Sequence, residues 1–147
     1  MFDFLFPNHP FGGHTLRLVA QAQQGGADIF DIARAMKNVV AGDKDGWERE
    51  WLALAKKTEA RAHAALAAGH AGTARQNFFH ASNYYRMSDV LLTSAEESKR
   101  GERFRKSQDN FRAAAKLNPG KIEVITVRCG DQEYDGYFCH PVNPKPG

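Results

Sequence analysis

The sequence predicts a mostly α-helical protein in which antiparallel helices are followed by a β-hairpin. Apolar residues recur every three or four positions through most of the chain, and short glycine-containing connections between these stretches make neighbouring helices antiparallel. The pattern then changes to two runs rich in β-branched and aromatic residues, KIEVITVRC and YDGYFCHPV, joined by the turn residues GDQE. With 147 residues, 42% hydrophobic and 25% charged, the chain is one domain at most and long enough to bury a core.

The first predicted helix follows Gly25-Gly26, which separate it from a short apolar segment containing Leu16, Leu18 and Val19. Asp28 is suited to cap its N-terminus, because a short carboxylate accepts hydrogen bonds from the free N–H groups of the first turn. Gly42 is expected to end it. One face of this helix carries Ile29, Ile32, Ala33, Met36 and Val40.

A longer helix is predicted next, capped by Asp43 or Asp45. Its apolar face has the strongest helical periodicity in the sequence and carries Trp47, Trp51, Leu54, Ala55, Thr58, Ala62, Ala65, Leu66 and Gly69. Gly69 and Gly72 then mark a connection to a third helix. The expected buried stripe of that helix consists of Ala74, Phe78, Ala81, Tyr85, Ser88 and Leu92.

The last predicted helix covers about 98 to 117, with Phe104, Gln108, Phe111 and Ala115 on one side, and Asn118-Pro119-Gly120 ends it. Residues 1–118 therefore form a helical part, 119–141 a β-hairpin and 142–147 a linker or a cleaved end. A two-stranded hairpin is marginally stable alone, so we expect its strands to pair with other strands or to lie on the helices.

Composition argues against several classes of protein. The net charge of +3 is spread along the chain, and no nucleic-acid-binding motif accompanies it, so binding to nucleic acid is not expected. No apolar run reaches the roughly 20 residues of a membrane span, so no membrane association is expected either. The start, MFDFLFPNHPF, lacks the basic region of a signal peptide. The six histidines include no H-x-x-x-H pair, and the paired glycines at 12–13 and 25–26 are turn signals rather than phosphate loops, so no metal and no cofactor is expected.

The two cysteines and the missing export signal favour a reducing, cytoplasmic location. If residues 130 to 133 form the turn, Cys129 faces about residue 134 and lies far from Cys139, so both are expected to be free thiols. The aromatic residues of the N-terminal segment are expected to dock on the body of the protein or on a second subunit, which allows a homodimer; they are Phe2, Phe4, Phe6 and Phe11.

The stretch ASNYYR, residues 81 to 86, is unusual in the middle of a predicted helix because serine, asparagine and tyrosine are mediocre helix formers. One interpretation is substrate lining by Asn77, Tyr84 and Arg86, in which Arg86 holds a carboxylate or enolate oxygen. The alternative is structural: Asn83, Tyr84 and Tyr85 anchor neighbouring elements by hydrogen bonds, and Arg86 pairs with Asp89 or Glu59. Core packing is expected of Trp47, Trp51, Phe78, Tyr85 and Phe111.

Several spaced motifs occur together in a fixed order. They are W-x-x-x-W at 47–51, G-H-x-x-T-A-R at 69–75, ASNYYR, and D-G-Y-F-x-x-P at 135–141. From about Gly25 to Pro141, the chain resembles the N-terminal region of the α/β-hydrolase family that includes 2,6-dihydroxypseudooxynicotine hydrolase and the fungal heptaketide (yellowish-green pigment) hydrolase. The resemblance implies that the helices form a cap, or lid, over an active site and that the hairpin leads into a hydrolase sheet carrying a Ser-Asp-His triad.

The nucleophile of such an enzyme lies in a G-x-S-x-G turn, and this motif is absent from the sequence. No catalytic residue is therefore assigned here. Either a second polypeptide carries the catalytic body, or the chain was cut at its proline-rich end, or it is a free-standing relic of the cap.

Our first hypothesis is the cap of a serine hydrolase that cleaves a C–C bond or an ester of an aromatic or polyketide-like carbonyl substrate. Its partners would be the small-molecule substrate and an α/β-hydrolase catalytic body on the same or a second polypeptide. The rival hypothesis is a non-catalytic helical-hairpin module that binds a protein, although the sequence shows no repeat of the roughly 34-residue period of such arrays. Strand pairing by Ile122, Val124, Ile125 and Val127 with another polypeptide favours the first, and a hairpin closed on its own helices favours the second.

Overall fold

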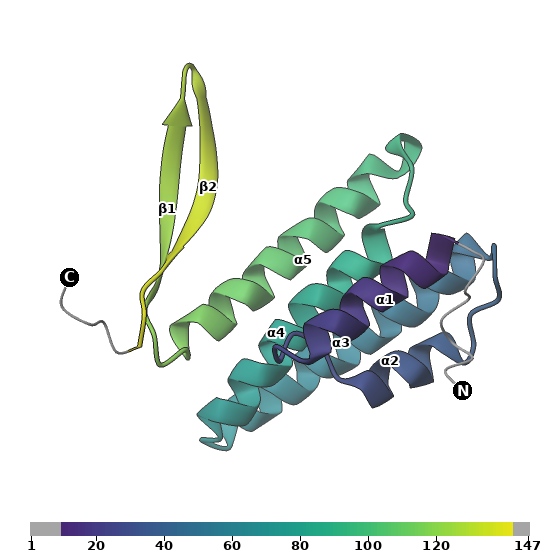
Figure 1. The fold of residues 1–147 in the computed structure, drawn as a ribbon, viewed down its shortest axis with the longest axis horizontal. Coiled ribbons are helices and arrows are strands. Elements are labelled where there is room, and N and C mark those ends of the chain that lie inside the picture. Colours follow the sequence, from purple (N-terminus) through teal and green to yellow (C-terminus); the bar gives the residue numbers. More distant parts are fainter. Residues whose placement is uncertain (1–9, 143–147) are drawn as a thin grey trace.

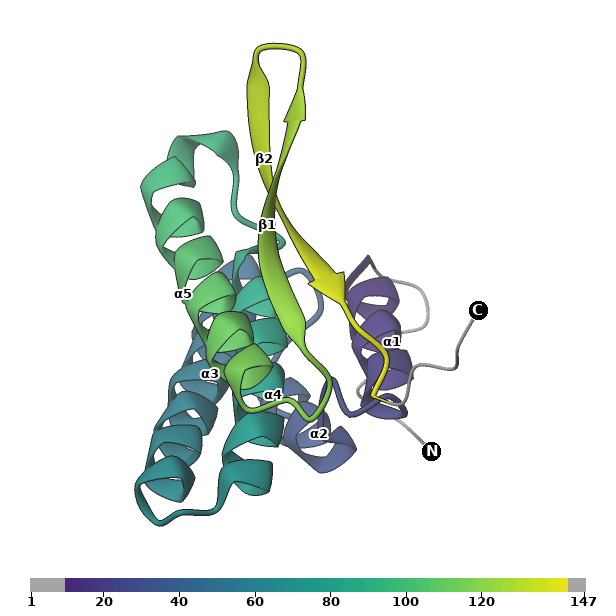
Figure 2. The ribbon, with the colours of Figure 1, turned by 90° about the vertical axis from the view of Figure 1, so that its left-hand side faces the viewer.

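The computed structural model describes residues 10–142, which form a layer of helices followed by a two-stranded antiparallel hairpin (Figures 1 and 2). The predicted fold class, mostly helical with a terminal hairpin, is confirmed. The predictions made for the aromatic residues of segment 1–9, for the absence of a signal peptide there and for the linker at 143–147 lie outside the described residues.

Helix α1 (Pro10–Ala22) begins the described chain, and its existence was not predicted. The prediction that Gly12 and Gly13 mark a turn is wrong, since both lie inside this helix. Pro10 occupies the first helical position, where its fixed φ suits the helix and no N–H is needed. Packing decides the outcome: Phe11 is buried with its ring 4.7 Å from that of Trp47, and this tertiary contact outweighs the low helix propensity of glycine.

Helix α2 (Ile29–Met36) starts where predicted, because the Asp28 carboxylate accepts hydrogen bonds from the N–H groups of the next turn. It ends earlier than predicted, however, and does not continue to Gly42. Beyond Met36 the chain leaves the helical path, so Val39 turns into the core whereas Val40 is 65% exposed. The expected place of Val40 on the buried face is therefore wrong.

Helices α3 (Lys44–Ala67) and α4 (Ala71–Asp89) form the centre of the layer and pack along their lengths. The Asp43 side chain caps α3 by accepting from the N–H of Gly46 at 2.9 Å, and a Cβ at position 46 would collide with that carboxylate. Gly69 makes the connection with φ of 78°, a left-handed conformation that glycine adopts without strain. The predicted packing residues Trp47, Trp51, Phe78 and Tyr85 are all buried.

A short 3-10 helix, η2 (Ser94–Glu96), leads into α5 (Glu97–Lys116), which packs on α4. The buried stripe of α5 differs from the predicted one by about one residue. Phe104, expected on the same side as Phe111, is 46% exposed. Most of the buried residues of α5 are polar, namely Arg103, Ser107 and Asn110, and the others are Ala114 and Ala115. These polar side chains can be buried because they find hydrogen-bonding partners inside the layer. Apolar periodicity does not detect such residues and therefore points to the neighbouring stripe.

The hairpin consists of β1 (Ile122–Cys129) and β2 (Gln132–Cys139), paired from Ile122 opposite Cys139 to Cys129 opposite Gln132. The turn contains only Gly130 and Asp131, so Cys129 faces Gln132 and not residue 134 as expected. Both cysteines are free and exposed. They lie at opposite ends of the hairpin, which explains why they are not bonded to each other.

One face of the hairpin contacts α5. The ring of Tyr137 lies 4.5 Å from that of Phe111, and Asp135 accepts from the Arg112 guanidinium at 3.1 Å. On the other face, Val127, Tyr134 and Phe138 are each at least 50% exposed. In Figures 1 and 2 the turn end of the hairpin projects beyond the helices, and within residues 10–142 no third strand joins the sheet.

Candidate functional site

The polar stretch ASNYYR of α4, residues 81 to 86, connects α4 to four other parts of the molecule. Ser82 lies 3.1 Å from the hydroxyl of Ser107 on α5, oxygen to oxygen. The Asn83 side-chain amide donates to the carbonyl oxygen of Gly26, in the loop between α1 and α2, at 2.7 Å. Residues that are poor for an isolated helix are therefore used to hold neighbouring elements in place.

Tyr84 is fully buried, and its hydroxyl accepts a hydrogen bond from the backbone N–H of Asp28 at 2.9 Å. That N–H belongs to the residue that caps α2, so the phenol links α4 to the start of α2. Its ring lies 5.8 Å from that of Trp51. Burial raises the pKa of Tyr84 well above its ordinary value, so the phenol stays protonated at physiological pH.

Tyr85 points to the other side of α4 and donates its hydroxyl proton to Glu59 of α3 at 2.6 Å. The same carboxylate accepts from Asn110 and Lys106 of α5 at 3.1 and 3.2 Å. Burial tends to raise the pKa of Glu59, but these three donors outweigh it and hold the pKa below its ordinary value. Glu59 is therefore an ionised junction between three helices.

Arg86 is half exposed and pairs with the buried carboxylate of Asp89 one turn later, as the structural interpretation expected. Its guanidinium also lies over the ring of Phe104, 5.3 Å from the ring centre. Burial raises the pKa of Asp89 despite the nearby arginines. Arg86 thus combines a structural ion pair with access to the surface.

Two surface pockets flank Arg86. The pocket between α4 and α5 is lined by charges of both signs, Arg86 and Arg100 against Asp89 and Glu97. The pocket between α1 and α4 is lined by His14, Arg17 and Gln21 from α1 and by Asn83 and Arg86 from α4, and no carboxylate from the described part of the chain lines it. The sequence did not point to this second pocket, because α1 was not predicted.

The three predicted substrate-lining residues differ in their surroundings. Arg86 lines both pockets, whereas Tyr84 lies beneath the surface. Asn77 is partly exposed about two turns before Tyr84 on α4 and donates to the carbonyl of Thr73 at 2.9 Å. Their contact with a substrate stays a prediction.

A buried carboxylate that sequence reasoning missed lies at Asp31 on α2. It pairs with Arg34 of its own helix and with Arg61 of α3, at 2.5 and 2.7 Å. Burial opposes ionisation, but the two arginines outweigh it and hold the pKa of Asp31 below its ordinary value. The spacing of Asp31 and Arg34 is a helical ion-pair signal, but nothing in the sequence indicates the long-range partner.

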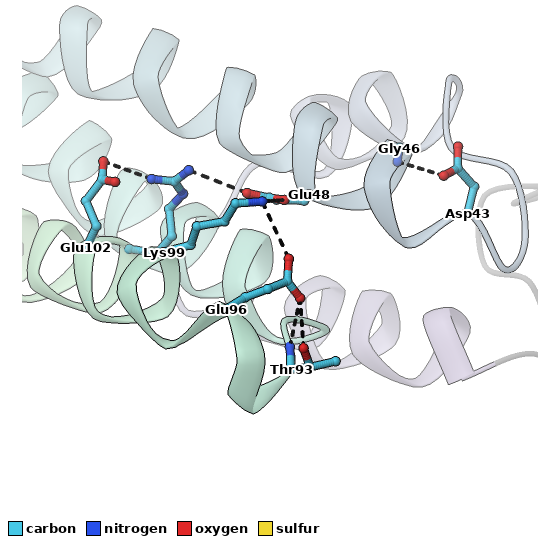
Figure 3. Close-up of polar contacts among 8 residues, drawn as sticks. Asp43, Gly46, Glu48, Thr93, Glu96, Lys99 and Glu102 are labelled. Carbon is cyan, nitrogen blue, oxygen red and sulfur yellow. Dashed lines mark hydrogen bonds and ion pairs between the residues drawn. The ribbon is translucent and has the colours of Figure 1, made fainter.

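A second cross-helix network joins the start of α3 to the start of α5 (Figure 3). The carboxylate of Glu48 lies 3.5 Å from both Lys99 and Arg103, and Arg103 also pairs with Glu102 at 2.9 Å. Glu96, which completes the capping box of Thr93, reaches Lys99 as well. These contacts fix the loop between α4 and α5 against α3, which makes this network structural.

Within residues 10–142, histidine, cysteine, aspartate and glutamate side chains form no cluster of three or more able to hold a metal ion. None of the described helices is both long and apolar enough to cross a membrane. The arrangement of side chains on α4 is suited to holding the helices together and to presenting Arg86 at the surface.

No family model matches the chain. It is similar to curated fungal proteins: 30% identical over 122 residues to the alpha/beta hydrolase ucsC of Acremonium sp, covering 81% of this chain and 25% of that protein. It is 28% identical to the hydrolase pyiE of Pyricularia grisea (93% and 32%) and 27% identical to the alpha/beta hydrolase gkaG of Penicillium citrinum (92% and 32%). The chain spans a quarter to a third of these relatives' length, and over that part it is similar to fungal α/β hydrolases.

Proposed function

We propose that this chain is the helical cap of an α/β-fold serine hydrolase and encloses an aromatic or polyketide-like carbonyl substrate over a triad outside these 147 residues. The partial-length similarity to proteins named as alpha/beta hydrolases supports the class of enzyme. The cap role, the substrate and the catalytic body as a partner are inferred from the family resemblance and from the arrangement of the hairpin.

The observation that carries the proposal is the uncovered hairpin. Val127, Tyr134 and Phe138 are each at least 50% exposed on the face away from α5, and both outer edges of the two-stranded sheet lack a partner within residues 10–142. Open edges and apolar strand faces are normally covered in native proteins. Further strands of a hydrolase sheet would pair with an edge, and the helices that connect those strands would cover the apolar face.

In the complete enzyme, a serine would attack the substrate carbonyl while a His-Asp pair moves the proton and backbone N–H groups stabilise the oxyanion. The role of this chain would be to exclude water and to orient the substrate. Arg86 is the best placed of the predicted contacts because it reaches the surface, and Asn77 is the next. Tyr84 lies beneath the surface, and its hydroxyl is already bonded to the Asp28 N–H, so it would support the substrate-lining surface from below.

Labelling with a fluorophosphonate, which reacts with activated serines, tests this function. The protein is purified from its native source, treated with the probe and digested, with a heat-denatured sample as control. The proposal expects one labelled serine, within a G-x-S-x-G peptide of the same or a copurifying polypeptide, and hydrolysis of aryl esters or β-diketones that the probe abolishes. Absence of both labelling and hydrolysis from the native protein would refute it.

The rival hypothesis, a protein-binding helical module, expects a hairpin closed on its own helices. Contacts between Phe111 and Tyr137 and between Arg112 and Asp135 cover one face only. The exposed opposite face gives the hydrolase proposal the stronger support.

A further inference from the structure

The pocket between α1 and α4 has a volume of about 350 Å³, within the range of small-molecule sites, which begins at roughly 300 Å³. Figure 2 shows α1 and α5 on opposite sides of α4, and this pocket shares only Arg86 with the described lining of the pocket between α4 and α5. The residues that line it all belong to this chain, so the chain itself can be used to test binding there.

Positive charge without a matching carboxylate distinguishes this pocket. His14, Arg17 and Arg86 line it, and among residues 10–142 neither an aspartate nor a glutamate does. Arg86 is paired with Asp89, but Asp89 lines the neighbouring pocket. Arg17 is exposed and forms no ion pair or hydrogen bond with any residue from 10 to 142.

The electrostatic effect of this arrangement is visible at His14, which is partly buried. Burial lowers the pKa of His14, and the positive charge of Arg17 lowers it further. The lowered pKa keeps His14 neutral at pH 7, beside the positive charge of Arg17. A bound anion would offset the charge of Arg17 and would make protonation of His14 easier.

The remaining walls are suited to an apolar molecule with one polar end. The Gln21 and Asn83 amides supply neutral hydrogen-bonding groups, and Leu18, Met87 and Val90 supply apolar contacts. Asn83 is fixed by its bond to the Gly26 carbonyl, so its position is set before a ligand arrives.

We propose that the α1–α4 pocket binds a small organic carboxylate with an apolar body, whose carboxylate pairs with Arg17 beside His14 and whose body lies on Leu18, Met87 and Val90. A planar guanidinium suits a carboxylate because two N–H groups bond its two oxygens. A single arginine that has no ion pair within residues 10–142, beside an apolar wall, fits a monoanion with a hydrocarbon body better than an inorganic phosphate.

Titration of the 147-residue chain with octanoate tests the proposal, with 1-octanol, acetate and inorganic phosphate as matched probes. Binding is measured by isothermal titration calorimetry and located by amide and histidine NMR shifts. We expect octanoate to bind more tightly than the three other probes, to shift resonances of α1 and α4, and to raise the pKa of His14. Arg17→Gln should weaken octanoate binding by about tenfold or more, since a charged hydrogen bond is lost.

Arg105→Gln is the matched control, because Arg105 is an exposed arginine of α5 outside this pocket and should leave octanoate affinity unchanged. Arg17 is exposed, so its replacement should not unfold the protein, and far-UV circular dichroism checks this. The proposal is overturned if Arg17→Gln binds octanoate as tightly as the parent chain, if 1-octanol or phosphate binds as well as octanoate, or if no shifts occur in α1 and α4.

Discussion

Replacing Tyr84 by phenylalanine tests the central role of α4 in holding the helices together. The substitution keeps the buried ring against Trp51 and removes only the hydroxyl that accepts from the Asp28 N–H at 2.9 Å. The N–H, which is only partly buried, then lacks its partner. Leaving a buried polar group unsatisfied costs about 1–3 kcal/mol, and the partial exposure of Asp28 places the expected loss of unfolding free energy near 1–2 kcal/mol.

The matched control is Tyr134→Phe, the same chemical change on a side chain that is 57% exposed on the hairpin. Its effect should stay within about 0.5 kcal/mol, as for ordinary surface substitutions. Urea unfolding followed by circular dichroism at pH 7 gives both values, and an unchanged m-value shows that the comparison is valid. Equal effects of the two substitutions would refute a structural role for the Tyr84 hydroxyl.

Three further predictions concern other parts of the chain. Asp31→Asn should lower the unfolding free energy by about 1–2 kcal/mol at pH 7, a figure reduced because the partner arginines are exposed. Since the folded-state pKa of Asp31 lies below its unfolded value, this stabilisation is present above pH ~4 and disappears as pH falls through the folded pKa; urea melts at pH 7 and pH 3 that show the same difference would contradict it. Gly69→Ala should destabilise by about 1 kcal/mol because of its positive φ, whereas Gly101→Ala inside α5 should stabilise by about 0.5–1 kcal/mol; thermal melts with the same sign for both would be inconsistent with the two backbone conformations. Val127→Lys should reduce self-association of the 147-residue chain in sedimentation velocity, with little change in unfolding free energy, and unchanged association would show that the exposed hairpin face is not adhesive.

The parts of the fold that were predictable are those in which apolar periodicity and capping residues agree. The starts of α2 and α3 satisfy this condition, with Asp28 and Asp43 as caps and with Trp47 and Trp51 of α3 in the core. Helix α1 was missed because Gly12 and Gly13 have low helix propensity, and its stability comes from long-range contacts such as that of Phe11 with Trp47.

The candidate site was predictable only in part, for a related reason. The polar residues of ASNYYR are visible in the sequence, but Ser82, Asn83, Tyr84 and Tyr85 find their partners at least 25 residues away on other elements, and no local pattern indicates those pairings. The buried face of α5 was misassigned because Ser107 and Asn110 are buried through such partners. The α1–α4 pocket depends on a helix that the sequence did not reveal.

A denaturing intact-mass spectrum of the protein purified from its native source tests the hydrolase-cap account most directly. The account predicts either a continuous species of about 40 kDa, or the 16.4 kDa chain together with a second polypeptide of about 25 kDa, the sizes expected for an added hydrolase body. A 16.4 kDa chain that is folded, monodisperse and without a partner polypeptide would contradict the account and would leave a binding domain as the better explanation.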